Sequence, residues 1–169
     1  NKLDREVREP MELLQEIESV LNIDCAPITW PIGMGKTFRG VWHLLHEQLM
    51  RFKPGEEHAG GETELIEGIN NPKLDELFPL EMGRLRDDVE LIQGASHPFD
   101  ITAFLAGQQS PVFFGSGINN FGVREILQAL VDWAPPPQPR DATIRVVEPA
   151  ETPFTGFVFK IQANMDPRH

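Results

Sequence analysis

The stretch Pro111-Val112-Phe113-Phe114-Gly115-Ser116-Gly117, followed by an amphipathic segment over residues 123–131, decides the fold class of this chain. An uncharged run that ends at a glycine is typical of a short strand buried in a parallel sheet. The apolar positions of the following segment recur every three or four residues, which predicts a helix. Strand, small-residue loop and helix in this order indicate an α/β protein.

Working outward, the upstream sequence predicts further helices and strands. A helix should run from about Pro10 to Leu21, because proline suits a first helical position and apolar residues then share one face. Asn70-Asn71-Pro72 signals the start of another helix. The remaining expected elements are a strand over 26–32, a turn at 33–35, a hairpin over 38–52, an exposed loop over 53–63, a strand over 64–69, a helix stripe from Met82 to Ile92 ended by Gly94, and a short helix over 99–105.

Downstream, residues 135–140 read as a linker, because four prolines cannot continue a helix and favour a stiff extended chain. Two strands are expected beyond it, over 143–148 and 154–161, without partner strands in this sequence. The predicted organisation is therefore a domain over 1–134, a linker over 135–140, and the start of a second domain over 141–169.

Composition narrows the possible functions. The chain has 169 residues, a net charge of −11 and one cysteine, which rules out an intramolecular disulfide framework. No apolar run is long enough to cross a membrane and no secretory signal opens the sequence, so a cytoplasmic setting is expected. Residues 54–100 hold twelve acidic and three basic residues, a net charge of −9. Such a surface repels nucleic acid; it is either a solvated face or a docking face for a basic protein.

Several motifs that could carry chemistry are weak. Gly33-Met34-Gly35-Lys36-Thr37 imitates a phosphate loop, but position 30 is tryptophan where the pattern needs glycine. His43 and His46 are three apart in a predicted hairpin, so their rings should point to opposite faces rather than share a metal. Cys25 reads as a buried structural thiol. No catalytic residue and no metal ligand is assigned.

Asn1-Lys2-Leu3-Asp4 has a more specific chemistry. A carboxylate such as that of Asp4 can accept two parallel hydrogen bonds from the N1–H and 2-amino edge of guanine, whereas adenine lacks both donors. The Asn1 amide can reach N7 and O6, and the Lys2 stem can lie across the base. The backbone N–H groups of a second loop, Ser116 and Gly117, would meet O6. The five candidate base-binding residues are Asn1, Lys2, Asp4, Ser116 and Gly117.

On these residues the chain resembles the translational GTPases, whose guanine-reading motifs are Asn-Lys-x-Asp and a later small-residue loop. Ser116 follows Asp4 by 112 positions, a spacing similar to that of the members of this group that carry a large insert. Blocks such as Cys25–Gly33, Trp133–Arg140 and above all Phe154–Pro167 resemble the bacterial peptide-chain release factor 3 family. This resemblance implies GTP or GDP as the ligand, and the ribosome and decoding release factors as partners.

The resemblance also implies which part of a GTPase this chain covers. The phosphate loop, the switch loops and the Mg²⁺ site of the family lie before its Asn-Lys-x-Asp motif. The chain is therefore expected to be an internal fragment: part of a doubly wound, P-loop-type GTP-binding domain with an α+β insert at about 24–108, then the first strands of a β-barrel domain. It is not expected to hydrolyse GTP alone. Two alternatives stay open, namely a non-enzymatic acidic docking module and a fragment of an elongation-factor-G-like translocase.

Overall fold

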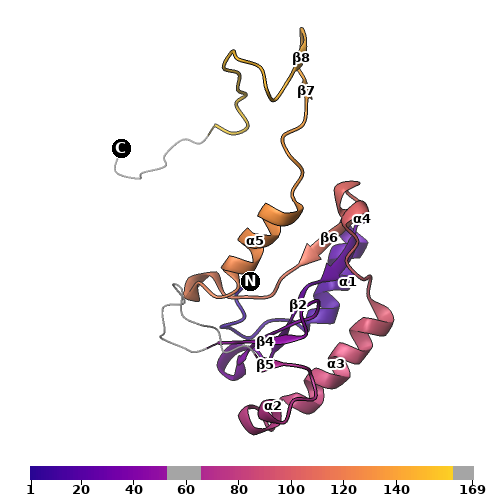
Figure 1. Ribbon diagram of the computed structural model, residues 1–169, viewed down its shortest axis with the longest axis vertical. Coiled ribbons are helices and arrows are strands. Elements are labelled where there is room, and N and C mark those ends of the chain that lie inside the picture. The colour runs from indigo at the N-terminus through magenta and orange to yellow at the C-terminus, as the bar shows by residue number, and fades with distance from the viewer. Residues whose placement is uncertain (53–65, 162–169) are drawn as a thin grey trace. The chain divides into compact units, whose positions relative to one another are not determined.

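The computed structural model describes residues 1–52 and 66–161, and the predicted loop over 53–63 lies outside them. The chain divides into two units, Asn1–Ala134 and Pro135–His169, which are described separately. The first unit mixes helices and strands (Figure 1), and this confirms the predicted α/β class. Its elements are α1 (Pro10–Leu21), β1 (Asp24–Pro27), β2 (Thr29–Ile32), the 3₁₀ turn η1 (Gly35–Thr37), β3 (Gly40–His43), β4 (Gln48–Arg51), β5 (Ile66–Glu67), α2 (Pro72–Leu77), α3 (Met82–Ala95), α4 (Ile101–Leu105), β6 (Gln109–Val112), the 3₁₀ turn η2 (Gly117–Asn119) and α5 (Val123–Trp133).

The strands of this unit form two sheets. β1 pairs with β6 in parallel, as expected for an α/β unit, while β2, β3, β4 and β5 form an antiparallel sheet in chain order. β6 begins two residues before the uncharged run predicted as a buried strand, and of its four residues only Gln109 is buried, the other three being partly exposed. The single strand predicted over 26–32 is wrong, because the segment is divided at Ile28. The Ile28 N–H donates to the Val112 carbonyl at 2.9 Å, and the Ile28 carbonyl accepts from the Leu44 N–H at 2.8 Å. One continuous segment therefore joins the parallel pair to the antiparallel sheet.

The helices begin and end close to where local signals predict. α1 runs from Pro10 to Leu21, and it is tied to β1 by a 3.0 Å hydrogen bond from the Cys25 N–H to Glu18 Oε1. The side chain of Asn71 caps α2 by accepting from the Lys73 N–H, which satisfies one of the free donors at that end. α3 ends one residue beyond Gly94. Asp100 caps α4 in the same way as Asn71 caps α2.

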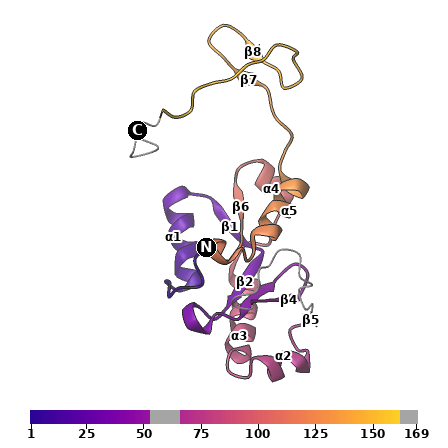
Figure 2. The ribbon, with the colours of Figure 1, turned by 90° about the vertical axis from the view of Figure 1, so that its left-hand side faces the viewer.

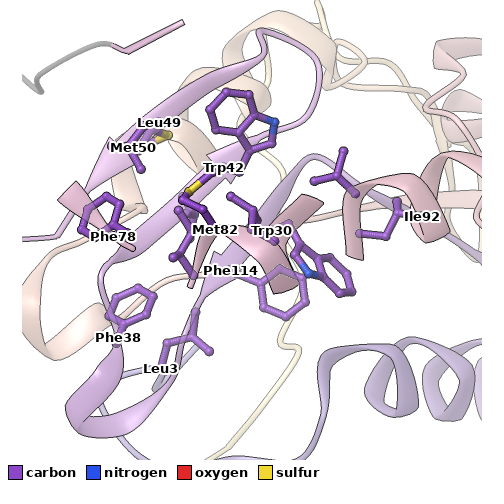
Figure 3. Close-up of a cluster of buried hydrophobic side chains, with 14 of the residues drawn as sticks. Leu3, Trp30, Phe38, Trp42, Leu49, Met50, Phe78, Met82, Ile92 and Phe114 are labelled. Carbon is purple, nitrogen blue, oxygen red and sulfur yellow. The ribbon is translucent and has the colours of Figure 1, made fainter. Parts of the chain in front are cut away.

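One apolar core joins α3, the antiparallel sheet and the segment after β6. In Figure 3, Met82 and Ile92 of α3 point into the same cluster as Trp30, Trp42 and Leu3. The indole of Trp30 is 1% exposed and donates to Asp88 Oδ2 at 3.1 Å, so a buried polar atom is satisfied. Cys25 is also buried, as predicted, and burial raises the pKa of its thiol.

The two histidines of the β3–β4 hairpin contradict the sequence prediction. Their rings stack in parallel with centroids 4.0 Å apart, and His43 Nδ1 accepts from the His46 N–H at 3.3 Å. The reason is that β3 ends at His43, so His46 lies in the turn and no longer follows the two-residue alternation of a strand. Glu47 adopts a left-handed φ of 50° in the same turn.

Burial of His43 makes the stability of the chain depend on pH. The ring is 7% exposed, and burial, assisted by the nearby His46, lowers the pKa of His43 to about 4. The unfolded chain then binds more protons than the folded one at pH 4–6.5, so stability falls as the pH falls through that window. We expect the free energy of unfolding to drop by about 2 kcal/mol between pH 7 and pH 5 through this group alone. Urea titrations of wild type and His43→Gln should show a shallower drop in the variant, whereas exposed His97→Gln should keep the full drop; equal slopes for wild type and His43→Gln contradict the prediction.

The second unit contains little regular structure among its described residues. β7 (Arg140–Asp141) pairs with β8 (Val146–Val147) as a short antiparallel ladder, close to the first strand predicted there. The strand predicted over 154–161 is wrong: these residues form no strand, and Phe154 and Phe159 are 98% and 86% exposed. A segment rich in β-branched and aromatic residues forms a strand only when another strand pairs with it.

Candidate functional site

Two loops that are far apart in the sequence meet in the first unit and bring the predicted base-binding residues together. The first loop is Asn1–Asp4, which precedes α1, and the second is Gly115–Gly117, which follows β6 and leads into η2. The Leu3 N–H donates to the Gly115 carbonyl at 3.2 Å, and Leu3 is 2% exposed. Figure 1 and Figure 2 both show the N-terminus, where the first loop begins, close to the segment between β6 and α5. The buried Leu3 thus anchors the two loops against each other.

The side chain of Asn1 links the loops by accepting two backbone hydrogen bonds. Its Oδ1 accepts from the Gly117 N–H at 2.9 Å and from the Lys2 N–H at 2.7 Å. Lys2 has a left-handed φ of 69°, which is uncommon for a residue with a Cβ. Because Oδ1 accepts from both N–H groups, the orientation of the amide is fixed, and Nδ2 remains to donate to a ligand.

Asp4 is joined to the second loop through Ser116. The Ser116 hydroxyl donates to Asp4 Oδ1 at 2.5 Å and accepts from Asn119 Nδ2 at 2.8 Å. Ser116 is fully buried, so both roles of its hydroxyl are fixed by protein partners. The role of Asn119 was not predicted, although its position three residues after a serine is a usable signal, because Ser and Asn side chains readily form hydrogen bonds within a turn.

Electrostatics keep Asp4 ionised. The hydroxyl of Ser116 lowers the pKa of the Asp4 carboxyl most, burial opposes this, and the positive charges of Arg5 and Lys2 add to the lowering. Arg5 Nε lies 3.9 Å from Asp4 Oδ2, and both Lys2 and Arg5 are exposed. An ionised carboxylate is an acceptor only. The site therefore combines a carboxylate acceptor with an amide donor.

The two glycines of the second loop differ in the space available for a Cβ atom. A Cβ on Gly115 would lie 2.5 Å from the Phe121 carbonyl oxygen, so nothing larger than glycine fits there without a backbone shift. A Cβ on Gly117 would meet only the Asn1 side chain, at an ordinary 3.5 Å. Alanine is therefore compatible with position 117, and the N–H donor of that residue does not depend on its being glycine.

The other motifs singled out from the sequence are not part of this site. Residues 33–37 are a tight turn between β2 and β3, without the following helix that a phosphate loop requires. Within residues 1–52 and 66–161 no three His, Cys, Asp or Glu side chains are grouped closely enough to hold a metal ion. No helix in that part of the chain is long and apolar enough to cross a membrane.

Comparison with known proteins shows strong sequence similarity over the whole chain. The chain is 71% identical over 174 aligned residues to peptide chain release factor 3 of Aromatoleum aromaticum; the match covers 100% of this chain and 32% of that relative. This confirms the resemblance predicted from the sequence, and the chain spans about a third of the relative's length. No family model matches. A crystal structure of a protein from Thermus thermophilus is similar with a TM-score of 0.48 and 21% identity, over 78% of this chain and 21% of the other.

Proposed function

We propose that this chain is an internal part of a GTP-binding translation termination factor, and that its two joined loops bind the guanine base. The observation that carries the proposal is the pair of hydrogen bonds between the loops, Ser116 Oγ to Asp4 Oδ1 and Gly117 N to Asn1 Oδ1. These bonds join residues 112 and 116 positions apart. The similarity to release factor 3 supports the same assignment.

Each residue has a role that follows from its contacts. Asp4, held ionised, accepts hydrogen bonds from N1–H and the 2-amino group of guanine. Asn1 donates through Nδ2 to N7, and the Lys2 stem covers the face of the base. Ser116 orients the Asp4 carboxylate by its hydroxyl. The Gly117 N–H, which donates to Asn1 Oδ1 in the structure, would be shared with guanine O6.

In the complete protein GTP would be the substrate that is hydrolysed, and this chain would select its base. Asp4 is partly buried, and a site whose polar groups match one base disfavours a base that would leave those groups unpaired. We assign the phosphates and Mg²⁺ to the part of the protein outside this chain. In the complete protein, the function would be GTP-dependent recycling of decoding release factors from the ribosome, in the cytoplasm.

A matched pair of glycine variants tests the proposed site in the complete protein. Gly115→Ala should weaken GDP binding by about ten-fold or more, because the new Cβ would clash with the Phe121 carbonyl and displace the loop. Gly117→Ala should bind GDP within about two-fold of wild type, because its Cβ has room and the N–H remains. Titration with fluorescent GDP checks both. Equal affinities for the two variants would contradict the assignment of this loop to the site.

The docking-module alternative gains less support from the described contacts. Three carboxylates of the acidic segment are already engaged inside the molecule: Asp75 pairs with Arg86 through two 2.8 Å hydrogen bonds, Glu81 lies 3.2 Å from Arg39, and Asp88 accepts from Trp30. The other alternative, a fragment of a translocase, differs from a termination factor in the activity of the complete protein. A recycling assay and a translocation assay on the complete protein should show activity only in the first.

A further inference from the structure

The turn between β2 and β3 contacts the first loop of the proposed base site. The Gly35 N–H donates to the Leu3 carbonyl at 2.8 Å, and Leu3 in turn donates to Gly115 of the second loop. Gly35 has a φ of 57°, and a Cβ there would lie 3.1 Å from the Glu6 side chain, so the turn packs closely on the segment after Asp4. A backbone path thus runs from this turn through the first loop to the second.

The residue after this turn contacts the second loop through an aromatic cluster. The rings of Phe38, Phe52 and Phe121 lie mutually edge-on or tilted, with centroids 5.0 Å apart for Phe38 and Phe52, 5.5 Å for Phe38 and Phe121, and 5.4 Å for Phe52 and Phe121. Phe38 is 3% exposed and Phe121 is 5% exposed. Aromatic pairs in this geometry stabilise beyond the area that they bury.

Phe121 is in turn the residue that closes the second loop. Its N–H donates to the Ser116 carbonyl and its carbonyl accepts from the Ser116 N–H, both at 3.0 Å. Ser116 carries the hydroxyl that orients Asp4. A shift of the Phe121 ring therefore moves the backbone of Ser116, and with it the hydroxyl donor that orients the carboxylate.

We infer that Phe38 is a positioning residue for guanine selection: by packing on Phe121 it sets the place of Ser116, and so the orientation of Asp4 toward the 2-amino group of the base. Phe38 itself does not touch the base. The inference rests on the proposed function and goes beyond it, since it assigns a role in base selection to the turn between β2 and β3. It also makes that turn a point from which a contact elsewhere on the protein could alter nucleotide selection.

The ratio of GDP to IDP affinity in the complete protein measures this role. Inosine differs from guanosine only by the missing 2-amino group, so the ratio reports how well Asp4 is placed. A variant that is only less stable loses affinity for both nucleotides equally, and its ratio stays at the wild-type value. We expect Phe38→Ala to lower the ratio by about three- to ten-fold, and Phe38→Leu, which keeps most of the apolar volume, to lower it less.

Phe78→Ala is the matched control. Phe78 is also 3% exposed in the same core, but it lies at the end of α2, where the Arg51 guanidinium is 5.9 Å from its ring centroid. The ratio of GDP to IDP affinity of the Phe78→Ala protein should equal that of wild type. The inference is overturned if both Phe38 variants keep the wild-type ratio, or if Phe78→Ala lowers it as much as Phe38→Ala. A wild-type protein that does not prefer GDP over IDP overturns the proposed function together with this inference, whereas a preference that Phe38 does not affect overturns this inference alone.

Discussion

Replacing Asp4 by asparagine in the complete protein should exchange a preference for guanine for a preference for xanthine. The structure determines how the new side chain is oriented. The Ser116 hydroxyl, which accepts from Asn119, donates its proton to Asp4 Oδ1, and the carbonyl oxygen of an asparagine at residue 4 can accept that same proton. An asparagine there would turn its single carbonyl oxygen to Ser116 and leave its amide N–H₂ facing the base.

This orientation decides which base is accepted. The amide N–H₂ meets the 2-amino group of guanine as donor against donor, and leaving such a group unpaired costs about 1–3 kcal/mol. Xanthine has a carbonyl at that carbon and accepts from the same amide. GTP affinity should therefore fall by about ten-fold or more, while xanthosine triphosphate affinity rises.

Competition between the two nucleotides on the variant measures the effect. Asp75→Asn is a suitable control, because it makes the same charge change at a carboxylate that pairs with Arg86 and lies outside the two loops. That control should keep the wild-type preference for GTP. If Asp4→Asn also keeps it, Asp4 does not read the base and is only a structural loop residue.

The local parts of this fold were predictable because their signals are local. The spacing of apolar residues over Pro10–Leu21 and the cap at Asn71 are confirmed by α1 and α2. The division at Ile28 was not predictable in the same way. Residues 25–32 are buried throughout, so the segment has no alternation to show where one sheet ends and the other begins. That boundary depends on which strands pair with it, β6 on one side and β3 on the other.

The candidate site shows the same distinction. The chemistry of Asp4 and Asn1 toward a base could be argued from residue types alone. The contact between the two loops could not, since Ser116 lies 112 residues away from Asp4 and only the folded chain brings its hydroxyl to the carboxylate. The hydrogen bond from the Gly117 N–H to Asn1 Oδ1 could not be predicted either, because it depends on the amide oxygen of a residue 116 positions away. Nothing in the sequence around Phe121 predicts that its backbone closes the second loop.

Replacing Trp30 by alanine should cause a large loss of stability. Trp30 is 1% exposed, its ring lies edge-on to Phe114 at 5.4 Å, and its N–H is bonded to Asp88 of α3. The change leaves a large cavity and an acceptor without its donor. We expect the free energy of unfolding to fall by about 3–5 kcal/mol, which is a large part of the roughly 5–15 kcal/mol of an ordinary domain.

Urea unfolding followed by circular dichroism would measure this loss, and two further variants separate its causes. Trp30→Phe keeps most of the ring contact but removes the N–H, so it should cost about 1–3 kcal/mol. Leu80→Ala, at a residue that is 89% exposed, should change stability by less than about 0.5 kcal/mol. Since Phe114 directly precedes the Gly115–Gly117 loop, the Trp30→Ala protein should also bind GDP more weakly even at temperatures where it is folded. A Trp30→Ala protein as stable as Leu80→Ala would mean that β2, α3 and the segment after β6 are not held together by this indole.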